Sequence, residues 1–417
     1  MTETPFLPCP HGLPGANIKV LGVGGAGCNA INRMIDSGVT GVQFIAMNTD
    51  QQSLAHSKAH LKLPLGPQSS RGLGAGGSAE RGAVAAEESR EEVLAALQGA
   101  DMIFITAGMG GGTGTGAAPV LANYARELGA LTVAVVITPF AWEGRKKGDL
   151  ALAGLANLRD TADTVIVVSN ERLKNVCDAR VTMKEAFRVA DGVLIQGVRG
   201  IADLILKPGI INGDFADVEA VLRNGGEALI GTGAGRGEEA VMDALRKALA
   251  CPLLERAQSG AAANVMVSIT ADWEVMEASA IETAMNYLQD HYNGRPDIKA
   301  WTVEGEGMED RVLVTVLASG FDQEDKLDEE RRTSLHLGAA PSAPLPAYTS
   351  AAASQVLPAN VVSGRVYGEV PAGEVQGPTP TRLLPQAPTP SGELPGSSDD
   401  LHVPAIIRMG QGRLGIE

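Results

Sequence analysis

The 417-residue sequence has few cysteines and histidines and no long apolar run. Its four cysteines (Cys9, Cys28, Cys177 and Cys251) are scattered without a C-x-x-C pair, and so are its six histidines. A disulfide framework or a zinc site is therefore not expected, and a reducing cytoplasm is the expected setting. No stretch approaches the ~20 consecutive apolar residues that span a bilayer. The first fifteen residues lack a basic start and an apolar core, so no signal peptide is expected.

Basic residues are fewer than acidic ones, 34 Lys and Arg against 49 Asp and Glu. The formal net charge is −15 and the sequence pI is about 4.9. A nucleic-acid partner would require a basic face to offset its phosphates, and anionic lipid would require the same. We therefore expect no nucleic-acid partner and no direct insertion into a membrane.

The order of apolar segments predicts an α/β fold. After a flexible arm at residues 1–16, strand-like runs at 18–23, 42–50, 102–106, 131–138 and 164–169 alternate with helical stretches. The helices are expected to Ser37 and over 79–98, 115–128 and 147–160. Apolar strands that alternate with helices are typical of a parallel sheet covered on both faces. Residues 17–182 are thus predicted to form one ligand-binding domain.

Residues 183–208 form a different element. Apolar residues recur at helical spacing from 187 to 205, and Pro208 and Gly209 follow, so one long amphipathic helix is predicted. Residues 209–320 then suggest a smaller α+β domain, joined to the first through this helix. Its helices are expected near 216–223, 238–250 and 274–290, and its strands near 264–270, 298–303 and 311–318.

The composition changes after the last strand. Eleven of the 23 prolines lie between 341 and 395. Residues 321–398 are therefore predicted to be a disordered linker, because they bury too little to offset chain entropy. Apolar residues return at 399–417, and this segment is predicted to be a short partner-binding peptide. The alternative is an apolar terminus without a role.

Three glycine-rich loops belong to the first domain. They are "GVGGAGCN" (22–29), "RGLGAGGSAERG" (71–82) and "GMGGGTGTGAAP" (108–119), and each follows a strand or precedes a helix. In a parallel sheet such loops meet at the carboxyl edge of the strands, where helix N-termini bind anions. One loop with Asp50 would serve a nicotinamide dinucleotide, whereas three converging loops favour a triphosphate.

The third loop has no lysine, unlike the usual phosphate loop. Backbone N–H groups, the Thr113 hydroxyl and a helix dipole would hold the phosphates instead, with a metal ion neutralising their charge. Glycine is needed there because a Cβ would block the approach of the backbone to a phosphate.

"GGGTGTG" at 110–116 resembles the signature of the tubulin and FtsZ superfamily of self-assembling GTPases. Five further motifs resemble the FtsZ family, the branch that serves bacterial cell division: "NTD" (48–50), "PFAWEGRKK" (139–147), "FRVADGVL" (187–194), "NGDFADV" (212–218) and "VPAIIR" (403–408). The resemblance covers residues 17 to about 320 in unbroken order and the terminal motif. It implies a Rossmann-like GTPase domain, a long central helix, a smaller C-terminal domain and a disordered tail.

The resemblance also implies which residues bind GTP or GDP. Phosphates would lie against 25–29 and 112–114, the ribose against Glu143, and the guanine among Asn29, Asn170, Phe187 and Asp191. Asp191 lies on the apolar side of the long helix, where a charge requires a partner. The nucleotide-binding residues expected on this basis are Gly25, Ala26, Gly27, Cys28, Asn29, Asn48, Gly76, Gly110, Gly111, Gly112, Thr113, Gly114, Thr115, Gly116, Glu143, Lys147, Asn170, Phe187 and Asp191.

Two positions depart from the family pattern. Lys147 stands where the family usually has arginine, which puts a bidentate phosphate contact in doubt. Residues 74–79 read "GAGGSA" where the family usually has "GAGANP", so any contact from this loop comes from Ser78 or the backbone.

Asp214 and Asp217 lie three residues apart at a predicted helix start, just after Asn212. Helix capping accounts for both acids without a catalytic role. The resemblance implies instead that these three residues complete the site of the next subunit in a head-to-tail filament and polarise water at the γ-phosphate with Mg²⁺. It further implies a division ring, and recruitment of residues 401–409 by membrane-tethering and regulatory division proteins. A Rossmann oxidoreductase and a purely structural filament protein remain as alternatives.

Overall fold

The protein is described by a computed structural model, which covers residues 16–174, 182–207, 209–211, 213–251, 254, 262–274, 276–292, 296–305, 308 and 310–321. The predicted linker and terminal peptide lie outside the described residues, apart from residue 321, as does nearly all of the N-terminal arm. Within these ranges no helix combines the length and the hydropathy that crossing a bilayer requires.

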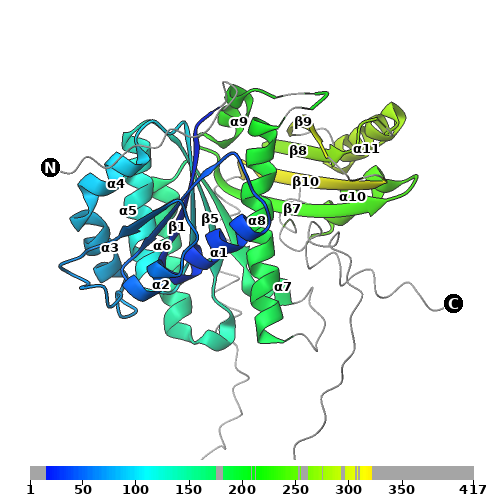
Figure 1. The fold of residues 1–417 in the computed structure, drawn as a ribbon. Coiled ribbons are helices and arrows are strands. Elements are labelled where there is room, and N and C mark those ends of the chain that lie inside the picture. The colour runs from blue at the N-terminus through cyan, green and yellow to red at the C-terminus, as the bar shows by residue number, and fades with distance from the viewer. Residues whose placement is uncertain are drawn as a thin grey trace, which may run out of the picture. The chain divides into compact units, whose positions relative to one another are not determined.

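All the strands in the described part of the chain belong to one ten-stranded sheet in the order β3-β2-β1-β4-β5-β6-β7-β10-β8-β9 (Figure 1). The strands are β1 (Ile18–Val23), β2 (Gln43–Asn48), β3 (Leu61–Pro64), β4 (Met102–Gly108), β5 (Leu131–Thr138), β6 (Thr164–Ser169), β7 (Gly226–Arg236), β8 (Asn264–Ala271), β9 (Asp297–Glu304) and β10 (Arg311–Ser319). The helices are α1 (Gly24–Asp36), α2 (Gln51–Ala55), α3 (Ala79–Glu88), α4 (Arg90–Leu97), α5 (Thr113–Glu127), η1 (Ala141–Glu143), α6 (Arg145–Thr161), α7 (Asn170–Lys174), α8 (Met183–Leu206), α9 (Phe215–Leu222), α10 (Ala240–Leu249) and α11 (Ala278–His291).

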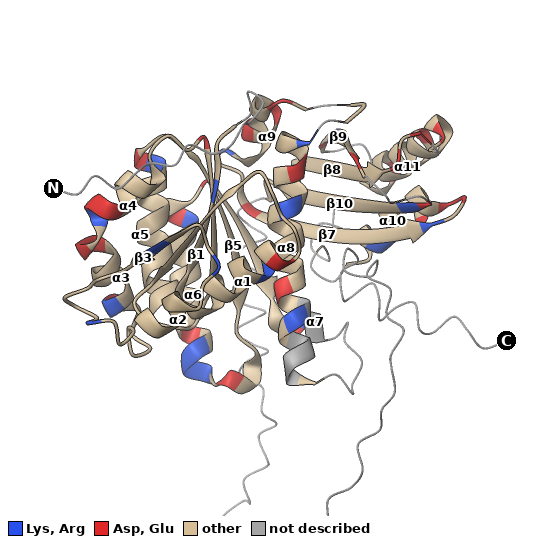
Figure 2. Cartoon of the chain, viewed as in Figure 1, with Lys and Arg blue, Asp and Glu red and all other residues tan. Residues whose placement is uncertain are grey.

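The strands from β1 to β6 are parallel, and both of their faces are buried. Alternate residues of β4 show this: Met102 and Phe104 pack with α1 and α8, whereas Ile103 and Ile105 pack with α3, α5 and α6. The predicted α/β class and its near-continuous apolar strands are thereby confirmed. Figure 2 shows most charged residues on the surrounding helices and loops and few on these strands.

The predicted long helix is α8. Its 24 residues correspond to about 36 Å of helix at 1.5 Å per residue. Leu194, Val198 and Ile201 are buried against the sheet, as their spacing predicts. In Figure 1, α7 lies near one end of α8 and α9 near the other. The helix therefore separates two distant ends of the molecule.

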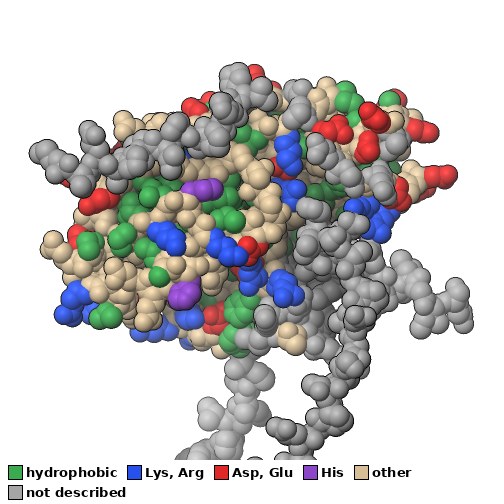
Figure 3. All heavy atoms as spheres, viewed as in Figure 1, with side chains coloured by type: hydrophobic (Ala, Val, Ile, Leu, Met, Phe, Trp, Pro, Cys, Tyr) green, Lys and Arg blue, Asp and Glu red, His purple; other side chains and the backbone are tan. Residues whose placement is uncertain are grey.

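The second half continues the same sheet. β10 pairs antiparallel with β7 and β8, and β8 pairs parallel with the edge strand β9. β7 also pairs parallel with β6, Thr164 opposite Gly226. The sequence predicts a link through the long helix, and the structure adds this second link through the sheet. On the face seen in Figure 3, acidic side chains gather over the region of α11, which disfavours contact with polyanions.

The local expectations missed the break at Ser89 and the strands β3 and β7. Residues 79–98 form two helices, because the buried Ser89 hydroxyl binds the backbone N–H of Gly66 and the chain bends at this residue. β7 was not expected at all, since its alternate glycines weaken the apolar pattern. A Cβ on Gly233 or Gly235 would lie within 2.0 Å of a carbonyl oxygen of α10, so these glycines let the helix pack directly on the strand.

Candidate nucleotide site

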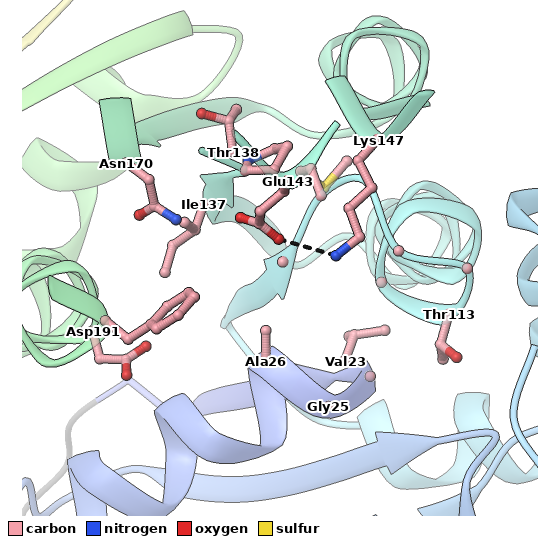
Figure 4. Close-up of a pocket in the computed structure, with 18 residues that line it drawn as sticks. Val23, Gly25, Ala26, Thr113, Ile137, Thr138, Glu143, Lys147, Asn170 and Asp191 are labelled. Atoms are coloured by element: carbon pink, nitrogen blue, oxygen red, sulfur yellow. Dashed lines mark hydrogen bonds and ion pairs between the residues drawn. The ribbon is translucent and has the colours of Figure 1, made fainter. Parts of the chain in front are cut away.

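A cavity of about 280 Å³ lies at the carboxyl edge of the parallel strands, between the ends of β1, β4 and β5 and the first half of α8 (Figure 4). Eleven of the residues that the sequence assigns to the nucleotide line it: Gly25, Ala26, Gly111, Gly112, Thr113, Gly114, Glu143, Lys147, Asn170, Phe187 and Asp191. Val23, Gly24, Gly108, Met109, Ile137, Thr138 and Pro139 complete the lining. Two of the three glycine loops thus meet at one cavity with residues from four other segments.

Two helix N-termini open into the cavity. α1 begins at Gly24 and α5 at Thr113, and neither helix has a side-chain cap. Their first N–H groups are therefore available to an anion, with the positive ends of both helix dipoles behind them. The Thr113 hydroxyl is 2.6 Å from the Thr49 hydroxyl, which fixes the start of α5 against the end of β2. This end of the cavity suits phosphate groups.

The glycines of the two loops have different roles. An added Cβ on Gly25 or Gly111 would have no heavy atom within 4 Å and would occupy open space at the cavity. A Cβ on Gly27 would lie 2.3 Å from the Thr106 carbonyl oxygen, and one on Gly114 2.5 Å from that of Gly108. Gly25 and Gly111 therefore keep space for a ligand, whereas Gly27 and Gly114 allow each helix to pack on β4.

The glycine loop at 71–82 does not line the cavity. The Ser78 hydroxyl caps α3 by accepting from the Arg81 N–H at 3.2 Å, and it donates to Glu80 at 2.7 Å. Gly76 has a φ of +60° in the turn before it. This loop lies against the phosphate end through Gly112, where an added Cβ would meet Ala75 at 2.8 Å. Its role at the cavity is thus support of the 108–116 loop.

Asp50 is not placed to bind a ribose. Its carboxylate caps α2 by accepting from the backbone N–H groups of Gln52 and Ser53, at 2.9 and 3.3 Å. A dinucleotide fingerprint would need this carboxylate at the cavity. The capping role removes the second sequence feature on which the oxidoreductase alternative rests.

The opposite end of the cavity is polar and largely buried. Asn170 is 3% exposed, and its Oδ1 atom has no hydrogen-bond partner among the described residues. Asp191 lies across from it on α8, and Figure 4 shows both side chains on the same side of the cavity, away from Thr113 and Lys147. The Phe187 ring, on the same helix, contacts Phe140 edge-on at 5.5 Å. Two oxygen acceptors beside an aromatic ring suit a base that carries adjacent N–H donors.

The partner that Asp191 requires is Arg33 of α1. Arg33 Nη1 lies 2.6 Å from Asp191 Oδ2 but makes no hydrogen bond, so the contact is an ion pair without hydrogen-bond alignment. Burial raises the pKa of Asp191 to about 6, although Arg33 acts in the opposite direction. Arg33 was missed by the sequence reasoning. Its signal is helical spacing, since Gly25, Asn29 and Arg33 are each four residues apart on one face of α1.

Glu143 and Lys147 form one pair at the rim. Lys147 Nζ donates to Glu143 Oε2 at 3.0 Å, and Glu143 Oε1 accepts from the Phe140 N–H at 2.9 Å. Figure 4 shows the lysine amino group directed toward the Glu143 carboxylate, on the side of the cavity away from Asp191. The residue that replaces the family's arginine therefore provides a single charge near the phosphate end, tied to a carboxylate.

The other predicted residues lie close by without lining the cavity. Thr115 is buried and accepts from the Gly110 N–H at 2.8 Å, and Gly116 packs against α3. Asn48 is buried, and its Oδ1 accepts from the Asp50 N–H. Burial raises the pKa of the Cys28 thiol to about 11, which makes it unreactive. Asn29 is exposed on α1.

The loop that carries Asp214 and Asp217, called the acidic loop below, lies away from the nucleotide cavity. Asp214 caps α9 by accepting from the Asp217 N–H at 2.8 Å, and the Asp217 carboxylate accepts from the Asp214 N–H at 3.4 Å. This reciprocal capping box is the structural role that the spacing predicts. Neither acid lines the nucleotide cavity, and Asn212 lies outside the described residues. Within the described part of the chain no three His, Cys, Asp or Glu side chains are grouped to hold a metal ion.

Residues 17–178 match the GTPase domain of the Tubulin/FtsZ family, and residues 226–322 match the C-terminal domain of the FtsZ family. Among solved structures, an empty FtsZ dimer from M. jannaschii is 41% identical, covering 73% of this chain and 88% of that one, with a TM-score of 0.69. A GTPγS-bound CetZ2 protofilament from Haloferax volcanii is 24% identical, covering 77% and 98%, with a TM-score of 0.64. The GDP-bound CetZ1 monomer of the same organism is 19% identical, covering 77% and 99%, with a TM-score of 0.63. The likeness to the two CetZ proteins shows the fold alone.

Proposed function

The chain belongs to the tubulin/FtsZ family and is a GTPase, and we propose that it assembles head to tail into filaments and hydrolyses GTP at the contact between subunits. We assign nucleotide binding to residues 17–182 with the first half of the central helix, and the catalytic loop to residues 209–320. The filament would form the division ring at the future septum. The observation that carries the proposal is the separation of the nucleotide cavity from Asp214 and Asp217.

The cavity favours one orientation of the nucleotide. The phosphates would lie at the N-termini of α1 and α5, where Gly25 and Gly111 leave open space. The guanine would lie between Asn170 and Asp191, because its N1–H and N2–H₂ groups match a carboxylate acceptor. Glu143 and Lys147 at the rim would then contact the ribose and a phosphate.

Among the described residues, the nucleotide cavity provides no unpaired carboxylate at its phosphate end. Of the acids that line it, Asp191 lies at the opposite end and Glu143 is paired with Lys147. Asp214 and Asp217 lie near the far end of α8, which is 15 residues, or about 22 Å of helix, beyond Asp191 at the cavity. A second copy stacked on the first would bring these two acids to the first copy's γ-phosphate, where they would orient the attacking water. Contacts of this heterologous kind generate a filament when they do not close.

Mg²⁺ is the proposed metal. When bound, it would neutralise charge on the β- and γ-phosphates. Mg²⁺ usually keeps several waters and needs only one or two carboxylates besides the phosphates, so the described residues fit it without a dedicated protein cage. The two acids of the incoming subunit supply those carboxylates.

A solved relative supports assembly. The M. jannaschii FtsZ structure, at 41% identity, is a dimer. We further propose that the protein works in the cytoplasm at the inner face of the membrane. Residues 401–409 would bind membrane-tethering and regulatory division proteins, and the linker 321–398 would set their reach.

The test is the rate of phosphate release as a function of protein concentration. An isolated subunit should bind GTP and barely hydrolyse it, so the rate per subunit should rise above a threshold concentration at which filaments sediment. NAD provides the control, because an oxidoreductase would consume it and leave GTP untouched. A rate per subunit that does not change with concentration would contradict hydrolysis at the contact, and filaments without phosphate release would indicate a purely structural protein.

A further inference from the structure

The acidic loop rests on β9, the edge strand of the sheet. The Thr302 N–H donates to the Ile211 carbonyl at 3.1 Å, and the Ile211 N–H donates to the Thr302 hydroxyl at 2.7 Å. The Trp301 ring lies against Gly213, where an added Cβ would fall 1.6 Å from the indole nitrogen. β9 thus determines where the loop before Asp214 runs.

The same strand also binds Asp217. Lys299 Nζ donates to Asp217 Oδ1 at 2.9 Å. Side chains two residues apart share one face of a strand, so Lys299 lies on the Trp301 face, toward the acidic loop. Both Asp217 oxygens are then engaged, since Oδ2 accepts from the Asp214 N–H at 3.4 Å. A single lysine from a distant strand therefore determines the direction of this carboxylate.

The two acids differ in what holds them. Asp214 is exposed and uses Oδ1 to cap α9, and it has no ion pair within the described residues. Asp217 is tied from two directions. The hydrogen bond from Lys299 lowers the pKa of Asp217, and the same bond raises the pKa of Lys299. The carboxylates of Asp214 and Asp297 also face Lys299 and act on it in the same direction.

The pair is poorly explained as a stabilising element. The Lys299 and Asp217 side chains are 28% and 42% exposed, and ion pairs at such positions contribute little to folding. The capping box already holds the start of α9 through backbone N–H groups. What Lys299 adds is a fixed direction for one carboxylate.

We infer that Lys299 is a positioning residue for GTP hydrolysis, which holds the Asp217 carboxylate in place for the nucleotide of a second copy of this chain. The inference rests on the proposed function, because it concerns the acids that act across the contact. Lys299 itself touches no nucleotide in its own subunit, since the nucleotide cavity is at the other end of α8.

The experiment compares Lys299→Met and Lys299→Arg with the parent in the full-length chain. Phosphate release is measured per sedimented subunit across pH 5.5 to 8, and GTP affinity is measured below the assembly threshold. Lys247→Met is the matched control, because Lys247 also pairs with an aspartate, Asp243, in the C-terminal half. Thermal unfolding is recorded for every variant, and Lys299→Gln replaces Lys299→Met if the latter does not fold.

Lys299→Met should lower kcat per polymerised subunit by about tenfold or more, the typical cost of losing a charge-assisted hydrogen bond. GTP affinity should not change. The loss should be similar at pH 5.5 and at pH 8, because the ordinary pKa of an aspartate, 3.8, lies well below this range and Asp217 is ionised throughout, with or without Lys299. Lys299→Arg should restore most of the rate, and Lys247→Met should match the parent.

Parental kcat in Lys299→Met would overturn the inference, and so would an increased rate. A variant that only loses assembly, with normal turnover in the polymer that forms, would show a structural role instead. If the parent's rate per subunit is independent of concentration, the proposed function fails and the inference fails with it. A concentration-dependent parent with an unaffected Lys299→Met contradicts the inference alone.

Discussion

At the scale of single residues, Asp191 joins ligand recognition to stability. The side chain lies at the nucleotide cavity, is 13% exposed, and faces Arg33. Asp191→Asn should weaken GTP binding by about tenfold or more, because one charge-assisted contact to guanine is worth ~1.5–3 kcal/mol. Affinity is measured below the assembly threshold. Asp203→Asn on the same helix, where Asp203 pairs with Arg199 and Lys207, should bind GTP like the parent.

In the absence of nucleotide, Asp191→Asn should be more stable than the parent. The pKa of Asp191 is about 6 in the folded chain against 3.8 for the unfolded group, so ionisation opposes folding. The loss of folding stability caused by the charged Asp191 is absent below pH 3.8, grows as pH rises toward 6, and is complete above pH 6. The free energy of unfolding of Asp191→Asn, relative to that of the parent, should therefore be up to ~3 kcal/mol larger at pH 7.5 than near pH 4. Urea unfolding of both proteins at the two pH values measures this. A constant difference, or unchanged GTP affinity, contradicts the assignment.

The sequence predicts that Asp191 needs a partner but not which one. The helical phase of 187, 191 and 194 places this acid among apolar residues, whereas Arg33 is 158 residues earlier and the contact between α1 and α8 is tertiary. The buried Oδ1 of Asn170 is likewise visible only once burial is known. Motifs indicate which residues belong to a site, and packing decides how they are paired.

At the scale of elements, α1 provides a matched pair of glycines two residues apart. Gly27→Ala should lower the unfolding midpoint strongly, because its Cβ would lie 2.3 Å from the Thr106 carbonyl oxygen. Gly25→Ala should leave stability within ~1 kcal/mol of the parent, because its Cβ meets nothing within 4 Å, and should weaken GTP binding by occupying the phosphate space. Thermal unfolding and nucleotide binding, measured on both variants, separate the two roles.

The reverse result would contradict the division of glycines into ligand-facing and packing positions. If Gly25→Ala binds GTP normally, the phosphates do not lie at the start of α1. If Gly27→Ala folds as well as the parent, the close packing of α1 on β4 does not require glycine at this position.

The elements differ in how well the sequence predicts them. β1, β4, β5 and β6 are continuous apolar runs, and each was predicted within two residues of its bounds. β7 was missed, because the alternation in "LIGTGAGR" is between glycines and other small or polar residues. Its glycines at 231, 233 and 235 all face α10. Their spacing of two residues therefore reflects close packing of this helix on the strand, and not an apolar face of the strand.

At the scale of the whole molecule, the sheet and α8 connect two ends with different roles. The nucleotide cavity lies at the first end of α8, and α9 with its two acids lies near the other. The contacts that organise the second end are long-range: Lys299 is 82 residues from Asp217, and β9 meets the loop before α9 through Thr302. No local pattern predicts such pairs, because they depend on the order of strands in the sheet.

The final prediction follows from the separation of these two ends. Asp217→Ala keeps an intact nucleotide cavity and has a defective acid loop, whereas Asp191→Asn has a weakened cavity and intact acids. At a GTP concentration that fills only the first variant, each protein alone should release almost no phosphate. In a mixture, contacts that join the cavity of Asp217→Ala to the acids of Asp191→Asn are complete. Random head-to-tail mixing makes about a quarter of the contacts complete at equal amounts, so the mixture should reach about a quarter of the parental rate.

The dependence on composition makes this test specific. Activity should be greatest at equal amounts and fall toward zero as either variant predominates, because complete contacts require one subunit of each kind. Asp217→Ala mixed with a second preparation of itself is the control for protein concentration. If the acids served the nucleotide of their own subunit, both variants would stay inactive in every mixture, since no subunit would hold a working cavity and working acids together. Recovery of phosphate release from two inactive proteins would thus require that the catalytic site be shared between copies.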